Sequence, residues 1–335
     1  MANCSGRRSA RPPSGSAGGA GATGRTAGEG GDPAPAGGGR AAPTDDLLLL
    51  LIVPLWAFNF TAIRYAVTNG FEPLAYASIR WVIAAVAFSI VTLRLEGSLW
   101  VSRRDLGLLT LLAACGLWLN QTSLSYSVHL ASAATVALLF GTLPAFIGLF
   151  SAVAGVQRLR ASEWAGIAVS FAGVALIAAG SGGKLSGHVG GILLALVTAA
   201  TFAAYSVGVV PLMRRYSPYR ISAVTASIGA VMLAVSGSWQ LSRQSWDAGG
   251  LAWGALLYGA LAAVGLGNLL WFKVIRRVGP GRAAVYLNLQ PFIGAVFALL
   301  VLSEGLKPLQ LAGGAVVGAG IVLARTRPPA APAAE

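Results

Sequence analysis

The sequence predicts an all-α integral membrane protein with ten transmembrane helices in two inverted five-helix repeats. Three observations carry this prediction. The chain is 56% hydrophobic and only 10% charged, well below the charge of a typical soluble domain. From Asp46 onward it divides into ten apolar stretches, each long enough to cross a hydrocarbon layer about 30 Å thick. Residues 144–176 also align without a gap onto residues 291–323, with ten of the 33 positions identical.

The two ends of the chain differ from the apolar middle. Residues 1–44 are rich in Gly, Ala, Ser, Pro and Arg and contain no apolar run. Such a composition cannot bury enough surface to order itself, and it lacks the hydrophobic region of a cleaved signal peptide. We therefore expect residues 1–44 to form a disordered cytoplasmic tail, and residues 326–335 to form a second, short cytoplasmic tail.

Each apolar stretch is expected to be a helix, because a helix satisfies its backbone polar groups within one segment in lipid. The strands of a membrane barrel would alternate apolar and polar residues, and runs such as Leu47 to Leu51 do not alternate. In chain order, the predicted spans are 47–67, 75–93, 106–127, 131–153, 164–180, 189–211, 220–239, 251–271, 283–302 and 309–325.

The duplication extends beyond the best-matching segment. At the same offset of 147 residues Gln121 aligns with Asn268, and the turn at Pro73 recurs at Pro218 at nearly the same spacing. We therefore predict a first five-helix repeat at residues 45–181 and a second at 187–325. Because five is odd, the second repeat must enter the membrane from the opposite side, as in many transporters with inverted repeats.

The net charge of +13 follows from topology rather than from nucleic-acid binding. With a cytoplasmic amino terminus, fifteen Lys and Arg residues lie on the inner side and three on the outer side, which is a strong positive-inside pattern. We expect a multi-pass protein of the plasma membrane with both termini cytoplasmic, whose basic loops contact anionic membrane lipid. The three outer cations are Lys184, Arg243 and Lys307.

Several short motifs occur in a fixed order along the spans. They are Trp56-Ala-Phe-Asn59-Phe60 with Ile63-Arg64, Pro73 with Ile79-Arg80-Trp81, and Pro291 with Ser303-Glu304-Gly305-Leu306 and Gln310-Leu311-Ala312-Gly313. By these motifs the chain resembles the EamA family of the drug/metabolite transporter superfamily. The resemblance implies ten helices in two inverted repeats and the transport of a small molecule. It covers nearly all of 47–325, and departs at Gln157-Arg158, where the family pattern favours Gly-Glu.

Two arginines lie inside predicted spans, where a charge is costly and asks for an explanation. Arg64 lies near the outer end of the first span and Arg80 near the outer end of the second. Both side chains either reach the outer interface with their stems in lipid or turn inward, where they would attract a carboxylate or phosphate. For Arg80 the family resemblance favours a structural role.

Several uncharged polar and aromatic residues are candidates for a substrate pathway. Amide side chains both donate and accept hydrogen bonds, which suits a zwitterionic or hydroxylated substrate. Each of them could instead bond to a neighbouring helix, and a Trp near a span end is often an interface anchor. The candidates, besides the two arginines, are Asn59, Trp81, Asn120, Gln121, Tyr126, Tyr205, Asn288 and Gln290.

Pro144 and Pro291 occupy equivalent positions near the predicted bilayer midplane. A proline inside a helix removes a backbone hydrogen bond and kinks it. We predict a matched pair of hinges for alternating access, with a fixed bend for packing as the alternative.

Catalytic and cofactor patterns are missing from the sequence. No metal-binding His-Glu-x-x-His, Gly-x-Ser-x-Gly or phosphate loop occurs, and all eleven acids lie in tails, loops or span ends. We expect no cofactor, no metal and no enzymatic activity. The prediction is a secondary transporter that exports a small metabolite or drug by alternating access; a passive facilitator or channel and a non-transporting membrane sensor are the alternatives.

Overall fold

The computed structural model describes residues 43–154, 161–180, 185–278, 286–287 and 289–325. The two predicted tails lie outside these residues, apart from Pro43 and Thr44. The described part of the chain is helical and contains no strand. Its longer helices are α1 (Pro43–Thr68), α2 (Pro73–Glu96), α3 (Arg103–Ala113), α4 (Asn120–Leu130), α5 (Ala133–Phe140), α6 (Leu143–Val153), α7 (Ala161–Gly180), α8 (Leu185–Gly208), α9 (Pro218–Ser236), α11 (Gly249–Leu257), α12 (Gly267–Val278), α14 (Gln290–Leu302) and α15 (Pro308–Arg325).

Seven helical stretches of the described residues are long and apolar enough to cross a membrane. Two shorter apolar helices, Trp164–Ile177 and Gln290–Leu302, belong to α7 and α14. Large apolar side chains are well exposed on these helices, for example Leu251 (76% exposed) and Leu300 (73% exposed). Exposed apolar surface on this scale is expected where lipid, not water, is the solvent. The chain is therefore an all-helical, multi-pass membrane protein.

Two of the spans contain π-helical segments in the middle. Segment η1 (Ala114–Leu119) joins α3 to α4, and segment η3 (Tyr258–Leu266) joins α11 to α12. Residues 114–119 correspond to 261–266 at the offset of 147, so the two segments overlap when the repeats are aligned. A π-helical turn widens the helix locally and often marks a functional site.

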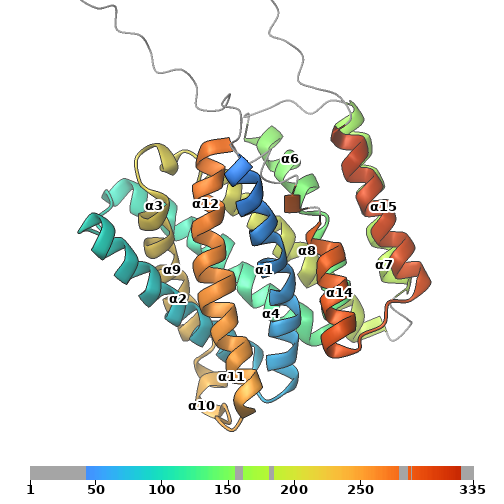
Figure 1. Ribbon diagram of the computed structural model, residues 1–335, viewed down its shortest axis with the longest axis horizontal. Helices are drawn as coiled ribbons and strands as arrows, with labels where there is room; N and C mark the ends of the chain where they lie inside the picture. Colours follow the sequence, from blue (N-terminus) through green and yellow to red (C-terminus); the bar gives the residue numbers. More distant parts are fainter. Residues whose placement is uncertain (1–42, 155–160, 181–184, 279–285, 288, 326–335) are drawn as a thin grey trace, which may run out of the picture. The chain divides into compact units, whose positions relative to one another are not determined.

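Helices from the two halves of the chain pack against each other throughout (Figure 1). Helix α2 packs along α9, and α7 packs along α15, which are equivalent helices of the two predicted repeats. Helix α4 packs against α8, and α1 packs against α12 and α14. The pairing of α7 with α15 depends on glycine, because a Cβ atom on Gly173 would lie 2.7 Å from the carbonyl oxygen of Gly313.

Helices α5 and α6 meet at a two-residue turn within one apolar stretch, Ala133–Val153. Gly141 and Thr142 form this turn, and Pro144 lies in the first turn of α6. Pro291 lies at the equivalent place in the first turn of α14. A proline is tolerated there because the missing N–H has no helical partner in any case. The two prolines at which the sequence predicts kinks therefore lie at helix starts.

Short caps and a small helix order the loops. Ser102, Ser132 and Ser217 cap the N-termini of α3, α5 and α9 by accepting a hydrogen bond from a backbone N–H three residues later, which satisfies one of the free donors at each helix start. The connection after α9 contains the one-and-a-half-turn helix α10 (Ser238–Arg243). A 3-10 turn, η2 (Leu212–Arg214), precedes α9.

Candidate functional site

A cavity lies between the helices in the middle of the bundle. Its free space of about 90 Å³ corresponds to roughly six water molecules, at about 15 Å³ of comparable volume each. Both halves of the chain line it, including both π-helical segments. The lining residues are Trp56, Asn59, Phe60, Arg80, Trp81, Phe88, Gly116, Leu117, Asn120, Gln121, Leu124, Phe140, Thr198, Phe202, Tyr205, Ser222, Thr225, Ala263, Val264, Asn268, Phe272 and Gln290.

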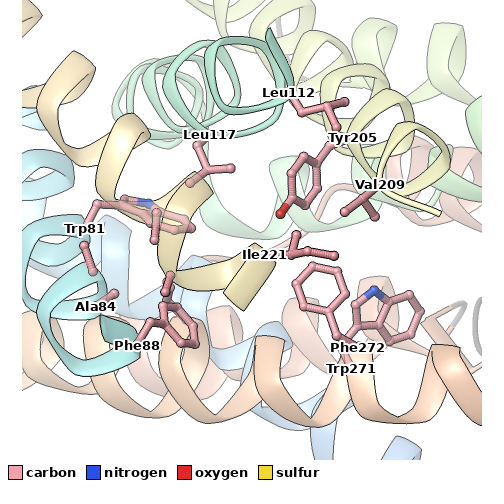
Figure 2. Packing of buried hydrophobic residues seen from close by; sticks show 14 of the residues in the cluster. Trp81, Ala84, Phe88, Leu112, Leu117, Tyr205, Val209, Ile221, Trp271 and Phe272 are labelled. Carbon is pink, nitrogen blue, oxygen red and sulfur yellow. The ribbon is translucent and has the colours of Figure 1, made fainter. Parts of the chain in front are cut away.

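Aromatic rings make up much of the cavity wall. Figure 2 shows Trp81 and Phe88 on one side, and Tyr205 and Phe272 on the other. The indole of Trp56 donates a 2.8 Å hydrogen bond to the carbonyl oxygen of Ala263 in η3. This bond ties α1 to the π-helical segment and fixes one ring of the wall. The cavity is therefore apolar over most of its surface, with few polar groups, as is usual for a small-molecule site.

Arg80 on α2 is the cation of this cavity. Its side chain is 0% exposed, and the wall closes tightly around it. The guanidinium lies over the ring of Tyr76, with Cζ 5.2 Å from the ring centroid, an arrangement that favours a cation. No carboxylate pairs with Arg80 in the described part of the chain, whose ion pairs are Arg64–Glu304, Arg215–Asp105 and Arg220–Glu96. A buried charge without a counterion is costly.

Amide side chains hold two of the three guanidinium nitrogens. Arg80 donates from Nη1 to Oδ1 of Asn59 at 3.2 Å and from Nη2 to Oε1 of Gln121. Gln121 in turn donates from Nε2 to Oδ1 of Asn120 at 2.6 Å, and Asn120 donates to the carbonyl oxygen of Thr198 at 2.7 Å. This chain of hydrogen bonds runs from α2 through α4 to α8, so it joins the two halves of the protein.

Two glycines let the helices approach the cavity closely. A Cβ atom on Gly259 in η3 would lie 2.9 Å from Cδ of Arg80 and 2.8 Å from the hydroxyl of Tyr76. A Cβ atom on Gly116 in η1 would overlap the ring of Tyr205. Both π-helical segments therefore position a cavity side chain of another helix.

Four residues that line the cavity each have a buried side-chain atom without a hydrogen-bond partner among the described residues. Two of these atoms are donors, Nε of Arg80 and Nε1 of Trp81, and the others are Oγ of Ser222 and Oε1 of Gln290. Buried polar atoms nearly always have partners. Unpartnered atoms around one cavity therefore identify it as a place for a polar ligand or water.

The structure brings seven of the predicted pathway residues into the wall of this one cavity. They are Asn59, Arg80, Trp81, Asn120, Gln121, Tyr205 and Gln290. Asn288 lies outside the described residues. Ser222 and Thr198 line the cavity but were not predicted, because a Ser or Thr inside an apolar helix commonly bonds only to its own backbone. Phe88, Phe202 and Phe272 also line it, and the sequence does not distinguish them from ordinary core residues.

Arg64 and Tyr126 lie apart from the cavity, at the end of the bundle that the charge pattern predicts to be external. Arg64 pairs with Glu304, with its Nε 3.3 Å from Oε1, and donates to the carbonyl oxygens of Val128 and His129 at 2.6 and 2.9 Å. Its side chain therefore neither extends along lipid nor faces the cavity. The hydroxyl of Tyr126 accepts a hydrogen bond of 2.8 Å from Gln240 on α10.

At the same end, Gln240 of α10 and Gln244, the residue after α10, form hydrogen bonds with the backbone of residues 70–74. Gln240 accepts a hydrogen bond from the backbone N–H of Leu74 at 2.7 Å. Gln244 accepts one from the N–H of Glu72 at 2.8 Å and donates one to the carbonyl oxygen of Gly70 at 2.7 Å. The segment after α9 is therefore fixed to the turn between α1 and α2.

The opposite end, predicted to be cytoplasmic, carries two ion pairs between the two halves of the chain. Asp105 accepts a bond from Arg215 Nη1 and one from the hydroxyl of Tyr216, each at 2.8 Å. Glu96 accepts bonds from Arg220 and from Ser217. These pairs join α2 and α3 to the start of α9. Charged contacts thus lie at both ends of the bundle, with the cavity between them.

Within the residues that the structure describes, no group of three or more His, Cys, Asp or Glu side chains is placed to hold a metal ion. The polar groups of the cavity are amides, hydroxyls, indoles and one guanidinium. Such groups bind an organic molecule or an anion by hydrogen bonds.

Comparisons with known proteins agree with this architecture. Residues 44–179 and 189–326 each match the EamA-like transporter family. A probable terminal-alkyne amino-acid exporter of Streptantibioticus cattleyicolor is 28% identical, over 83% of this chain and 92% of the exporter. A probable biotin transporter of Pseudomonas aeruginosa is 30% identical, over 82% of this chain and 95% of the transporter. A protein of known crystal structure superposes with a TM-score of 0.61 at 18% identity, covering 84% of this chain and 97% of that one.

Proposed function

Because the chain belongs to the EamA-like transporter family, we propose that it is a secondary transporter that moves a small metabolite or drug by alternating access. One observation carries this proposal most directly: a partly polar cavity lies between the two halves of the chain, with charged contacts at both ends of the bundle. A carrier needs such a central site and a closure on each side of it.

The proposed architecture is a pair of inverted five-helix repeats, 45–181 and 187–325. Equivalent features recur in both, which supports this arrangement. The π-helical segments η1 and η3 overlap at the offset of 147, and α6 and α14 begin at equivalent residues with a proline in the first turn. The packing of α2 on α9 and of α7 on α15 pairs equivalent helices, as a twofold relation between the repeats would require.

The residues at the site take distinct proposed roles. Asn59, Arg80, Trp81, Asn120, Gln121, Tyr205 and Gln290 line the substrate site, on the evidence of their place in the cavity wall. Arg64 and Tyr126 belong to the external closure, together with Glu304. The proposed hinges lie beside Pro144 and Pro291, because each proline stands in the first turn of a helix and hinges are commonly a few residues at the ends of elements.

The proposed setting is the plasma membrane, with both termini on the cytoplasmic side. The distribution of Lys and Arg supports this orientation. Export is the proposed direction, and the relative named as a probable amino-acid exporter supports it. The relatives named as an amino-acid exporter and a biotin transporter both point to small organic molecules. A transporter, not an enzyme, is the function that the cavity and the family support.

The test is transport by the purified protein in proteoliposomes. A panel of labelled amino acids, sugars, nucleosides and organic acids is offered with and without a pH gradient and a membrane potential. A carrier exchanges labelled for unlabelled substrate, so counterflow is expected for at least one compound. Flux without counterflow would indicate a passive facilitator, and binding without flux a sensor; no flux of any compound would refute the proposal.

A matched pair of variants connects the flux to the cavity. Asn120→Ala removes a cavity amide that bonds to Thr198 and Thr201, and it is expected to lower the rate of counterflow. Thr110→Ala lies on α3 of the same span, is half-buried outside the cavity wall, and bonds to its own helix at the carbonyl oxygen of Leu106. It is expected to leave the rate unchanged.

A further inference from the structure

The cavity offers hydrogen-bond donors and a positive charge, while most of its amide acceptors are already used. We propose that the site selects a net-anionic organic acid with an apolar body, and discriminates against the zwitterion and the cation of the same skeleton. Arg80 is the proposed anchor for the acid group. This inference rests on the proposed function, because it names the substrate class of the same cavity.

The cavity carries one positive charge. Arg80 is fully buried, and no acidic residue is among the described residues that line the cavity. The amide oxygens of Asn59 and Gln121 solvate the guanidinium but do not neutralise it. In a low-dielectric site an uncompensated positive charge attracts an anion strongly and repels a cation.

Two residues of the cavity wall have a donor that is not in use. Nε of Arg80 and Nε1 of Trp81 are buried and have no hydrogen-bond partner among the described residues. A carboxylate, or a singly charged phosphate ester, has the acceptor oxygens that such donors need. Hydrogen bonds to a charged group are worth about 1.5–3 kcal/mol, roughly ten- to a hundredfold in affinity.

The acceptors of the cavity wall are uncharged, whereas an ammonium carries three donors and no acceptor. The amide oxygens of Asn59 and Gln121 are directed at Arg80, and the amide oxygen of Asn120 accepts from Gln121. Oε1 of Gln290 and Oγ of Ser222 are buried without a partner, and Asn268 adds a further amide to the wall. These neutral oxygens suit a hydroxyl or N–H of a substrate, but they do not offset the repulsion between Arg80 and a charged amine.

The rest of the wall is largely apolar. Rings of Trp56, Phe88 and Phe272, among others, line the cavity, and Figure 2 shows Phe88 and Phe272 there. Burying an apolar group of the substrate against these rings favours binding, because it removes apolar surface from water. The site therefore combines one anion position with an apolar compartment, which excludes a sugar as well as an amine.

The experiment uses compounds that share a skeleton and differ in charge. The aromatic set is 3-phenylpropionate, its amide, phenylalanine and 3-phenylpropylamine; the aliphatic set is octanoate, octanamide, 2-aminooctanoate and octylamine. Binding to the full-length protein in nanodiscs is measured by quenching of tryptophan fluorescence and by the shift in melting temperature. We expect at least one acid to bind about tenfold or more tightly than its amide, its zwitterion and its amine.

Variants assign the preference to Arg80. Arg80→Gln is expected to abolish the preference for the acid over the amide, while the amide binds as before. Arg80→Lys keeps a cation and is expected to retain part of the preference, which covers the case in which Arg80→Gln does not fold. Arg94→Gln is the matched control, because Arg94 is an exposed arginine at the end of the same helix.

The outcomes separate this inference from the proposed function. If neither acid binds, if the zwitterion or amine binds as tightly as the acid, or if Arg80→Gln keeps the preference, the inference is wrong. Counterflow of amino acids, sugars or nucleosides in the same case would leave the transporter proposal intact. Conversely, selective binding of the acids without flux of any compound would support the site and refute transport.

Discussion

Arg64 and Glu304, 240 residues apart in the chain, form an ion pair in which Nε lies 3.3 Å from Oε1. The same carboxylate lies 3.4 Å from the backbone N–H of Ala134, in the first turn of α5. A carboxylate is stabilised at the N-terminus of a helix. One acid thus connects the end of α14 with α1 and α5, at the end of the bundle that we predict to be external.

The first prediction concerns this pair. The two side chains are 24% and 17% exposed, so the pair is neither fully exposed nor fully buried. A surface ion pair contributes about 0–1 kcal/mol to stability. Removing one partner of a buried pair costs about 3–5 kcal/mol. We expect Arg64→Gln and Glu304→Gln each to destabilise the protein by about 1–2 kcal/mol, measured as a lower melting temperature in detergent micelles. The double variant is expected to lose less than the sum of the two, because each single change leaves a partly buried charge unpaired.

Arg243→Gln is the control, since Arg243 is an exposed cation at the same end that stacks on Trp239. Its melting temperature is expected to stay close to that of the unaltered protein. Additive losses in the double variant would contradict the coupling of Arg64 to Glu304.

The second prediction concerns the π-helical segment η1. A Cβ atom on Gly116 would overlap the ring of Tyr205, and overpacking of a core typically costs about 1–3 kcal/mol. We expect Gly116→Ala to lower the melting temperature and to weaken binding of any ligand of the cavity. Gly107→Ala lies on α3 of the same span with nothing near its Cβ position. That variant is expected to be neutral or slightly stabilising, because Ala favours a helix by up to about 1 kcal/mol over Gly.

The third prediction concerns the packing of α7 on α15. A Cβ atom on Gly313 would lie 2.7 Å from the carbonyl oxygen of Gly173 and from the backbone nitrogen of Ile177. Backbone atoms cannot move aside without separating the helices, so Gly313→Ala is expected to lower thermal stability clearly. Gly318→Ala, on the same helix, would meet only the ring of Phe292 at 3.6 Å. Equal melting temperatures for the two variants would show that close approach of the backbones is not needed.

The fourth prediction concerns Gln244, which is 6% exposed. Its amide satisfies the N–H of Glu72 and the carbonyl oxygen of Gly70. Gln244→Ala would leave both without a side-chain partner, at a cost of about 1–3 kcal/mol. We expect a lower melting temperature and faster hydrogen exchange at residues 70–74. Ser242→Ala is the control, because Ser242 is exposed and bonds to Trp239 of its own helix. A similar exchange rate at residues 70–74 in both variants would show that the hydrogen bonds of Gln244 do not hold this turn.

Much of the architecture could be predicted from the sequence alone. Apolar stretches of span length, such as 75–93 and 220–239, predicted helices that the structure places at Pro73–Glu96 and Pro218–Ser236. The offset of 147 predicted that Pro144 and Pro291 would be equivalent, and each lies in the first turn of its helix. Such features depend on local composition, because a bilayer imposes helix length and satisfaction of the backbone within each segment.

The site could be predicted only in part. The rarity of polar groups in apolar spans was enough to single out Asn59, Arg80 and Gln121, which meet in one hydrogen-bonded group. The same criterion also selected Arg64, which lies at the end of the bundle in an ion pair with Glu304. A polar residue in a span is unusual wherever its side chain points, so its rarity does not say which neighbours it meets.

The sequence by itself therefore determined that this chain is a helical membrane protein of duplicated design, because the lipid environment acts on each segment separately. The tertiary structure decided which polar residues share a cavity, that Arg80 has no acidic partner among the described residues, and that Arg64 has one. The physical reason is that these relationships join atoms on different helices. They depend on how closely the helices approach, which glycines such as Gly116 and Gly259 permit, and on the local widening of two helices at η1 and η3.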